Sequence, residues 1–158
     1  MGVIMNKKEL KIISVFRNNA RENLTTASRK LNVPISTLYD KLKKYKGTVI
    51  TKHTALLDFD KLGFKLKVIM SFKVPIENKE VIQKFLERHH RVNTVYKISN
   101  KSDFLIETIF KDLIELSQFS EKLEKLNIKE KQEFYVIKDI KREAFLSDQI
   151  SVDLIADE

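Results

Sequence analysis

The first 45 residues carry apolar side chains at helical spacing. Between residues 8 and 18 these positions lie three or four apart, which predicts a first amphipathic helix. A shorter helix is predicted over residues 26–31 with Thr25 as its N-cap, and Pro34 then interrupts the pattern. A third helix is predicted over residues 35–45. Its apolar residues share one face: Ile35, Leu38, Leu42 and Tyr45. This is the pattern of a helix-turn-helix, with a sharp turn before the third helix.

The periodicity changes after the third helix. Residues 48–57 favour two short strands or a wing, and residues 58–64 favour a linker. Residues 65–74 alternate apolar and polar side chains, which predicts a half-buried strand. The remaining predicted elements are a helix over 78–90, strands over 92–99 and 104–110, a helix over 112–126 and a strand over 134–140.

The order strand, helix, strand, strand, helix, strand is typical of a ferredoxin-like sandwich, so the fold class is α+β. Both helices then cover one face of an antiparallel sheet, and a second copy of the domain is the simplest cover for the other face. We therefore expect a winged helix-turn-helix DNA-binding domain over 1–57, a linker over 58–64, a ferredoxin-like oligomerisation domain over 65–146, and an acidic tail or dimer-contacting extension over 147–158.

Charge is unevenly distributed along the 158 residues, whose net charge is +8. Residues 1–63 hold 13 Lys and Arg against 5 Asp and Glu, whereas residues 147–158 hold 4 acidic and no basic residues. The N-terminal part therefore favours a polyanionic partner. Cysteine is absent, which excludes disulfides and thiolate metal sites and favours an intracellular protein. No apolar run is long enough to cross a bilayer, so the expected location is the cytoplasm.

The predicted third helix leaves a polar surface that can enter the major groove of double-stranded DNA. Side chains near its N-terminal end, expected at base edges or nearby phosphates, are Ser36, Thr37 and Tyr39. Cationic side chains expected at phosphates are Arg29, Lys41, Lys43, Lys44 and Lys52. Asp40 would have to accept from cytosine N4 or pair with a lysine. The plain alternative is that these lysines form only a solvated helix face.

Residues 24–66 resemble the leucine-responsive regulator/AsnC family. The resemblance lies in the second helix, the turn, the recognition helix, the "GTVI" segment and the "LDFDKLGF" linker, and it continues through "VYKISNKSDFLIETIF" at 95–110. It implies a homodimer, often assembled further into tetramers or octamers, that recognises a DNA site with two-fold character. It also implies an amino-acid or related effector, bound near a Gly-Asp-x-Asp loop after the second strand of the ligand domain.

The corresponding loop departs from the family pattern. Asn100 stands in place of the glycine, Lys101 and Ser102 follow, and Asp103 alone matches the last acid. Asn tolerates the left-handed backbone that glycine supplies, so we expect the turn to be kept. Lys101 changes the charge presented to an amino-acid ammonium group, and Asp103 could equally be an ordinary turn residue.

Other functional classes have less support. His89 and His90 are adjacent and therefore lie on different helix faces, so no metal site is expected, and no cofactor motif occurs. Two alternatives stay open beside a sequence-specific regulator. One is an architectural protein that binds DNA without specificity; the other is an enzyme similar to the siroheme decarboxylases, which share this layout. The cationic third helix favours a regulator over an enzyme.

Overall fold

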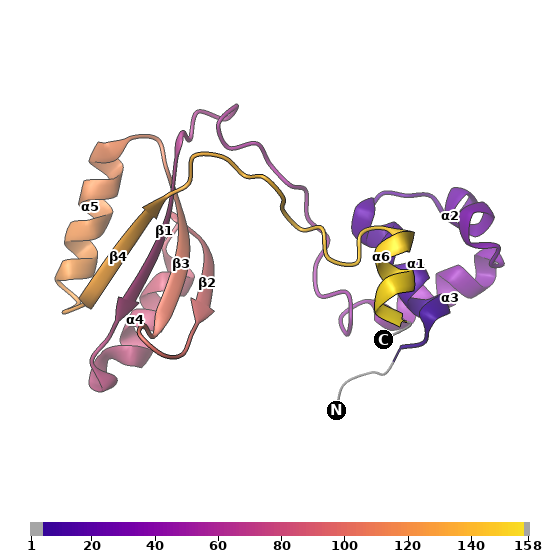
Figure 1. Cartoon of the computed structure of the whole chain (residues 1–158), viewed down its shortest axis with the longest axis horizontal. Coiled ribbons are helices and arrows are strands. Elements are labelled where there is room, and N and C mark those ends of the chain that lie inside the picture. Colours follow the sequence, from indigo (N-terminus) through magenta and orange to yellow (C-terminus); the bar gives the residue numbers. More distant parts are fainter. Residues whose placement is uncertain (1–4, 157–158) are drawn as a thin grey trace. The chain divides into compact units, whose positions relative to one another are not determined.

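The computed structural model describes residues 5–156, which divide into two compact units (Figure 1). Residues 57–139 form the sheet unit. The helical unit is discontinuous: it combines the residues up to Leu56 with those from Ile140 onward. The structure thus groups residues 140–146 with the helical unit, whereas the sequence analysis had joined them to the sheet domain.

The helical unit begins with three helices, α1 (Lys7–Asn18), α2 (Leu24–Leu31) and α3 (Ile35–Tyr45), close to the predicted ranges. They enclose a small core of fully or nearly buried apolar side chains. These are Ile12, Phe16, Ala27, Val33, Leu38 and Tyr45. The spacing of apolar residues in the sequence therefore identified the helices that form the helix-turn-helix.

Asparagine residues stand where the first two helices begin and where the second ends. Asn6 and Glu9 form a capping box at the start of α1. The N-cap of α2 is Asn23, whose side chain accepts from the backbone N–H of Thr26 at 2.7 Å. The prediction of Thr25 as the cap is wrong, because Thr25 is the second residue of the helix. Asn32 ends α2 in the left-handed region with φ 51° and starts the turn toward α3.

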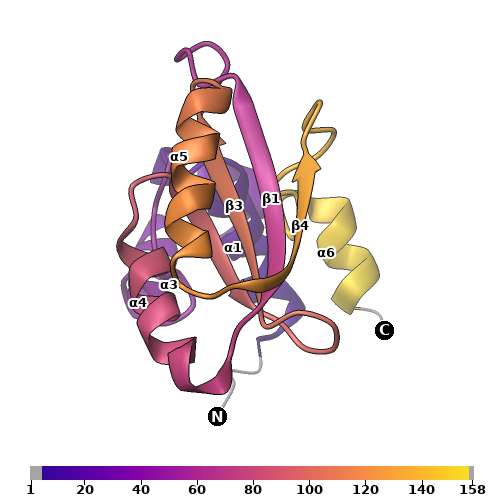
Figure 2. The ribbon, with the colours of Figure 1, turned by 90° about the vertical axis from the view of Figure 1, so that its left-hand side faces the viewer.

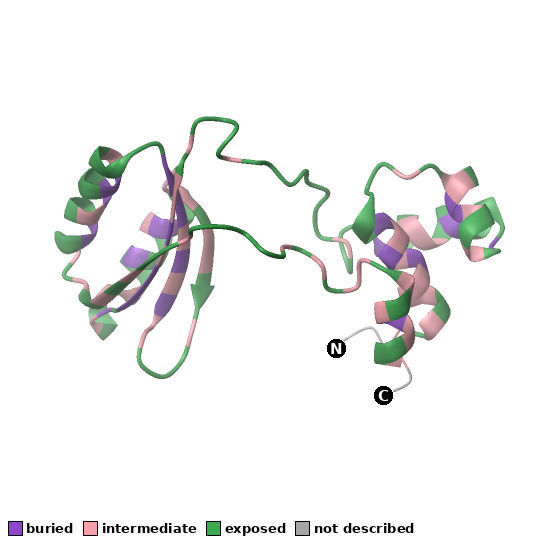
Figure 3. Ribbon diagram, turned by 45° about the horizontal axis from the view of Figure 1, so that its top comes forward, coloured by how far each residue is buried: buried purple, intermediate pink, exposed green. Residues whose placement is uncertain are grey.

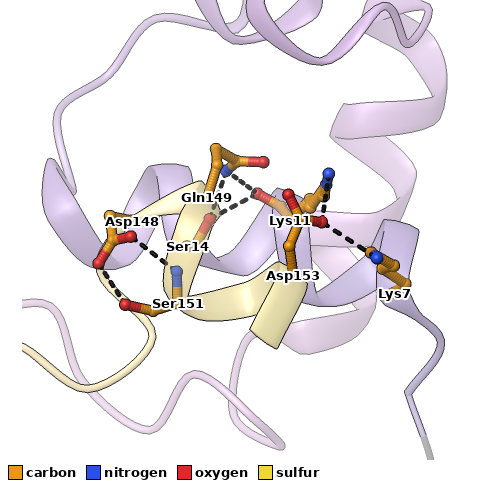
Figure 4. A network of polar contacts seen from close by, with 7 residues as sticks. All are labelled: Lys7, Lys11, Ser14, Asp148, Gln149, Ser151 and Asp153. Atoms are coloured by element: carbon orange, nitrogen blue, oxygen red, sulfur yellow. Dashed lines mark hydrogen bonds and ion pairs between the residues drawn. The ribbon is translucent and has the colours of Figure 1, made fainter. Parts of the chain in front are cut away.

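The C-terminal segment is not a tail. Residues Gln149–Ala156 form helix α6, and its Val152 is completely buried; residues 157 and 158 of the predicted tail lie outside the described residues, as do residues 1–4. Figure 4 shows α6 against α1: the Gln149 side chain donates to the Lys11 carbonyl and to Ser14 Oγ, and the Asp153 carboxylate pairs with Lys7 and Lys11. Asp153, one of the acidic residues that suggested a tail, therefore helps to hold α6 against the lysines of α1.

The segment after α3 does not form the expected wing. Within residues 46–58 the structure has a single bridge, between Lys46 and Ile50, and residues 51–58 are exposed without regular structure. The chain turns back immediately after α3, because the Ile50 N–H donates to the Tyr45 carbonyl at 2.9 Å. The remaining residues of the segment have no neighbouring strand to pair with.

The sheet unit has the predicted ferredoxin-like order. Its elements are β1 (Leu66–Lys73), the 3-10 turn η1 (Ile76–Asn78), α4 (Lys79–Arg88), β2 (Val92–Lys97), β3 (Phe104–Phe110), α5 (Leu113–Glu124) and β4 (Lys129–Tyr135). The strands form one antiparallel sheet in the order β2-β3-β1-β4. This arrangement confirms the α+β fold class.

Helices α4 and α5 cover the same face of the sheet (Figure 2). Alternate residues of β1 and β3 point into this layer, as the alternation of buried positions in Figure 3 shows. The core there includes Val68, Met70, Phe72, Phe104, Ile106 and Phe110 from the strands and Ile82, Leu86, Leu116, Phe119 and Leu123 from the helices. We call the opposite side the open face. Its apolar residues include Ile69, Tyr96, Leu105, Ile109 and Phe134.

The last strand lies earlier than predicted. β4 spans Lys129–Tyr135, and the apolar residues Ile137 and Ile140 that suggested a strand over 134–140 are 100% and 94% exposed. β4 is an edge strand with mostly polar side chains, held by its pairing with β1. The position of β4 is therefore set by its backbone hydrogen bonds with β1, which the hydropathy pattern of the sequence does not show.

Candidate nucleic-acid interface

The recognition-helix candidate α3 is anchored by two fully buried residues. Leu38 and Tyr45 are 0% and 2% exposed, and Leu42 is half-buried against the same core. Ile35 was expected on this buried face, but it is 45% exposed because the first turn of α3 extends beyond the core. The anchoring residues thus lie in the middle and at the C-terminal end of the helix.

The rest of α3 presents what we call the outward face. It consists of six exposed residues: Ser36, Thr37, Tyr39, Asp40, Lys43 and Lys44. Within residues 5–156 none of these side chains makes a hydrogen bond or an ion pair, so their hydroxyl, carboxylate and ammonium groups are all available to a partner. The sequence analysis had selected all six, and the structure brings them onto one helix.

Lys41 is the exception among the predicted lysines of α3. Its ammonium group pairs with Glu9 Oε1 at 2.5 Å, and its side chain is 35% exposed. Lys41 follows Leu38 by three residues and precedes Tyr45 by four, so helical geometry places it on the same side as these two buried residues. That spacing was the signal in the sequence that Lys41 points inward.

Glu9 is the acceptor of a small polar cluster between α1 and α3. Its Oε1 accepts from the Tyr45 hydroxyl at 3.0 Å as well as pairing with Lys41, and its Oε2 accepts from the Asn6 N–H at 3.2 Å. The Lys41 ammonium, followed by the Asn6 N–H and the Tyr45 hydroxyl, lowers the pKa of Glu9 to about 2. Burial and the Glu9 carboxylate raise the pKa of Tyr45 to about 12, so Glu9 is ionised and Tyr45 is neutral at pH 7.

Helix α3 begins without a side-chain cap, as α4 also does. The N-cap of α3 is Pro34, which supplies no side-chain acceptor, whereas the side chains of Asn6, Asn23 and Asp112 cap α1, α2 and α5. Backbone N–H groups in the first turn of a helix that lack a cap can donate to an anion such as phosphate. The first turn of α3 also carries Ser36 and Thr37, so hydroxyl and amide donors lie together.

Three exposed cationic residues lie outside α3, and two of them were predicted from the sequence. Arg29 is exposed in the last turn of α2, and Lys52 is exposed in the irregular segment after α3. Lys46, directly after α3, is also exposed and was not selected from the sequence. Its place after the end of a lysine-rich helix was the available signal.

The predicted ligand loop keeps the expected turn. Asn100 has φ 81°, the left-handed conformation that a glycine would adopt without strain. Lys101 is exposed and Ser102 half-buried, and within residues 5–156 neither side chain has a hydrogen-bond or ion-pair partner. The loop therefore offers one ammonium and one hydroxyl group.

Asp103 is already bound by its own chain. Its carboxylate accepts from the Val74 N–H at 2.9 Å and pairs with Lys79 at 2.6 Å. Its backbone N–H donates to the Phe72 carbonyl at 2.9 Å, and its carbonyl accepts from the Ile98 N–H. The Lys79 ammonium and then the Val74 N–H lower the pKa of Asp103. These contacts tie the loop to the end of β1 and the start of α4.

Metal-binding clusters and membrane-spanning helices are both absent from residues 5–156. Residues 5–156 contain no group of three or more His, Cys, Asp or Glu side chains placed to hold a metal ion. No helix within the same range combines the length and apolar character needed to cross a membrane.

The chain has relatives among helix-turn-helix regulators, although no family model matches it. An HTH-type transcriptional regulator of Pyrococcus abyssi is 24% identical over 143 residues, which cover 90% of this chain and 97% of that protein. An HTH-type transcriptional regulator of Pyrococcus furiosus is 26% identical over 136 residues, covering 85% of this chain and 92% of the relative. The similarity therefore extends over both units.

Solved structures share the fold at similarly low identity. A transcriptional regulator of Neisseria meningitidis, crystallised in complex with L-Met, superposes with a TM-score of 0.81 at 19% identity, covering 88% of this chain and 94% of the other. An AsnC family transcriptional regulator from Agrobacterium tumefaciens superposes with a TM-score of 0.78 at 20% identity, covering 87% and 94%.

Proposed function

We propose that this chain, which has the fold of the leucine-responsive regulator/AsnC family that its sequence resembles, is a sequence-specific DNA-binding transcriptional regulator. The observation that carries the proposal is the outward face of α3, where hydroxyl and ammonium groups lie side by side without internal partners. Regulators named HTH-type among the relatives support the same function.

The chemistry of the outward face suits a groove of double-stranded DNA. In a helix-turn-helix, the N-terminal residues of the recognition helix reach base edges, here Ser36, Thr37 and Tyr39. Lys43 and Lys44, farther along the helix, are suited to phosphates, whose contacts supply affinity but carry no sequence information. Asp40 accepts hydrogen bonds only, so it favours a cytosine amino group and disfavours phosphate.

The open face of the sheet supports a homodimer as the working form. Tyr96 and Phe134 are 54% and 53% exposed there, beside the apolar Ile69 and Leu105. Exposed apolar side chains gathered on one face mark an interface, and a second copy of the same face would cover them symmetrically. Two recognition helices related by a two-fold axis would then read a DNA site with two-fold character. The mass of the assembly in solution distinguishes a dimer from a tetramer or an octamer.

An amino-acid effector belongs to the same proposal. The N. meningitidis regulator was crystallised with L-Met, and the loop of this chain presents Lys101 and Ser102 unpaired. An ammonium and a hydroxyl are donors for a carboxylate, so these residues favour the carboxylate end of an amino acid. Asp103 is held by Lys79 and Val74 and contributes little to binding an ammonium group. Calorimetric titration with each of the common amino acids tests this part.

The central experiment selects bound sequences from a random pool of DNA duplexes at physiological salt. We expect an enriched motif made of two related half-sites about one helical turn apart, as two symmetric recognition helices require. Binding without enrichment would indicate an architectural protein instead. Absence of binding to any duplex, together with an absorption band on adding siroheme, would replace the regulator by an enzyme.

A further inference from the structure

The cluster around Glu9 joins the first helix to the recognition helix through two contacts. Glu9 lies in the first turn of α1, where the capping box with Asn6 fixes its side chain. From α3, Lys41 and Tyr45 both reach its Oε1. The Glu9 and Lys41 side chains are 16% and 35% exposed, and Tyr45 is 2% exposed, so the cluster is partly shielded from water. A shielded network of this kind is stronger than a surface ion pair.

The geometry of α3 makes this cluster a constraint on rotation. Lys41 and Tyr45 are four residues apart, so they lie on one side of the helix, one turn after the other. Holding both against one carboxylate adds to the burial of Leu38 and Tyr45 in resisting rotation of α3 about its own axis. Ser36, Asp40 and Lys43 project from the opposite side of the helix, so the same two contacts help to set which residues point outward.

We infer that Glu9 is a positioning residue for DNA recognition: by holding Lys41 and Tyr45, it sets the rotation of α3 that presents the outward face. Lys41 accordingly neutralises no phosphate, in contrast to Lys43. The inference rests on the proposed function, because it assigns a role in reading DNA to a residue that does not touch it.

Salt dependence distinguishes a positioning role from a phosphate contact. Each neutralised phosphate adds about 0.9 to the slope of log affinity against log salt concentration for duplex DNA. The variant Glu9→Gln/Lys41→Gln removes both charges of the pair, so the net charge of the unit is unchanged, and Gln at position 9 still completes the capping box. The matched control is Lys43→Gln, the same substitution on the outward face of the same helix.

The experiment measures the affinity of the full chain for the selected duplex and for a scrambled duplex over a range of NaCl concentrations. For Glu9→Gln/Lys41→Gln we expect an unchanged salt slope and a loss of about threefold to tenfold in the preference for the selected duplex, the size of one coupled polar contact. For Lys43→Gln we expect a slope smaller by about 0.9 and similar weakening on both duplexes.

Two results would overturn the inference. One is a slope for Glu9→Gln/Lys41→Gln that falls as much as that of Lys43→Gln, which would make Lys41 a phosphate contact. The other is an unchanged preference for the selected duplex. Circular dichroism and thermal unfolding verify that each variant is folded. If the double variant does not fold, Tyr45→Phe replaces it, since this change removes only the hydroxyl that donates to Glu9 and must reduce the same preference.

Failure of the proposed function has a different signature. A parent chain that binds no duplex at any salt concentration overturns both the function and the inference. A parent chain that binds, while its variants behave in one of the two ways just described, overturns the inference alone.

Discussion

The outward face of α3 and the loop after β2 were both predicted to bind a partner, and they differ in how their polar groups are used. On α3 the side chains of Ser36, Lys43 and Lys44 have no partner within residues 5–156. In the loop, the only acid that matches the family pattern, Asp103, binds Lys79 and the Val74 N–H. The polar groups of α3 are therefore available to a ligand as they stand, whereas Asp103 would have to break its own contacts to bind one.

This difference shows why residue type alone does not identify a site. A carboxylate that accepts two hydrogen bonds from its own chain stabilises the fold, and removing it leaves buried donors unsatisfied. An exposed ammonium group without partners adds little to stability but binds an anion without first losing a contact. Substitutions should therefore alter DNA binding on α3 and alter stability in the loop.

The largest effect is expected from reversing charge on the outward face. Lys43→Glu/Lys44→Glu replaces two phosphate-binding cations with carboxylates, so duplex affinity at about 0.1 M salt should fall on the order of 100-fold. The free energy of unfolding should change little, because both side chains are exposed and unpaired. Fluorescence anisotropy with a labelled duplex measures the first quantity and urea denaturation the second. Retention of the parent's affinity would remove α3 from the interface.

A smaller effect, and on stability only, is expected at Asp103. Asp103→Ala deletes the acceptor of the Val74 N–H and the partner of Lys79, so the sheet unit should lose about 1–2 kcal/mol of unfolding free energy. Duplex affinity of the folded protein should stay within twofold of the parent's, roughly the limit of such measurements. The matched control is Ser102→Ala, a neighbour in the loop whose side chain has no partner in the described chain. Equal losses for both variants would contradict a structural role for Asp103.

The contribution of Asp103 should depend on pH in a defined direction. Its pKa in the folded protein lies below the ordinary value of 3.8, so the ionised form is the one that folding favours. The stabilisation is therefore complete above pH 3.8 and is lost as the pH falls through the lowered folded-state pKa. The difference in unfolding free energy between the parent and Asp103→Ala should shrink across that acidic range. A constant difference would show that the charge of Asp103 is irrelevant.

Substitutions at Asn100, which test the turn without removing any contact, should cost no more than Asp103→Ala does. With φ at 81°, glycine should be tolerated there with a change of at most about 0.5 kcal/mol, whereas valine should cost about 1–2 kcal/mol. Thermal unfolding of Asn100→Gly and Asn100→Val measures both. Equal stability of the two variants would show that the left-handed turn does not constrain the loop.

Much of the fold was predictable because burial in it follows local periodicity. The spacing through Leu38 and Tyr45 gave α3, and the alternation through Val68, Met70 and Phe72 gave β1. Once the buried residues of α3 were predicted, the remaining residues of the helix gave its outward face. The turn at Asn100 was predictable for a similar reason, since a left-handed backbone restricts the residue types allowed.

What the sequence did not reveal depends on contacts between distant residues. β4 was displaced because its position is set by pairing with β1, and its polar residues carry no apolar alternation. Helix α6 was mistaken for a tail because Asp153 looks like a solvated charge until Lys7 and Lys11 are placed beside it. The spacing of Lys41 from Leu38 and Tyr45 indicated that it points inward, but its partner Glu9, 32 positions earlier in the chain, could not be identified from the sequence.

Helix α6 also has a consequence for the order in which the protein is made. The surface of α1 that holds Gln149, Val152 and Asp153 is completed by residues that are synthesised after the whole sheet unit. Residues 57–139 are synthesised earlier and form a unit of their own, so the helical unit departs from the usual N-terminal-first order of folding. The nascent chain therefore acquires its complete helix-turn-helix unit only after synthesis has passed α6.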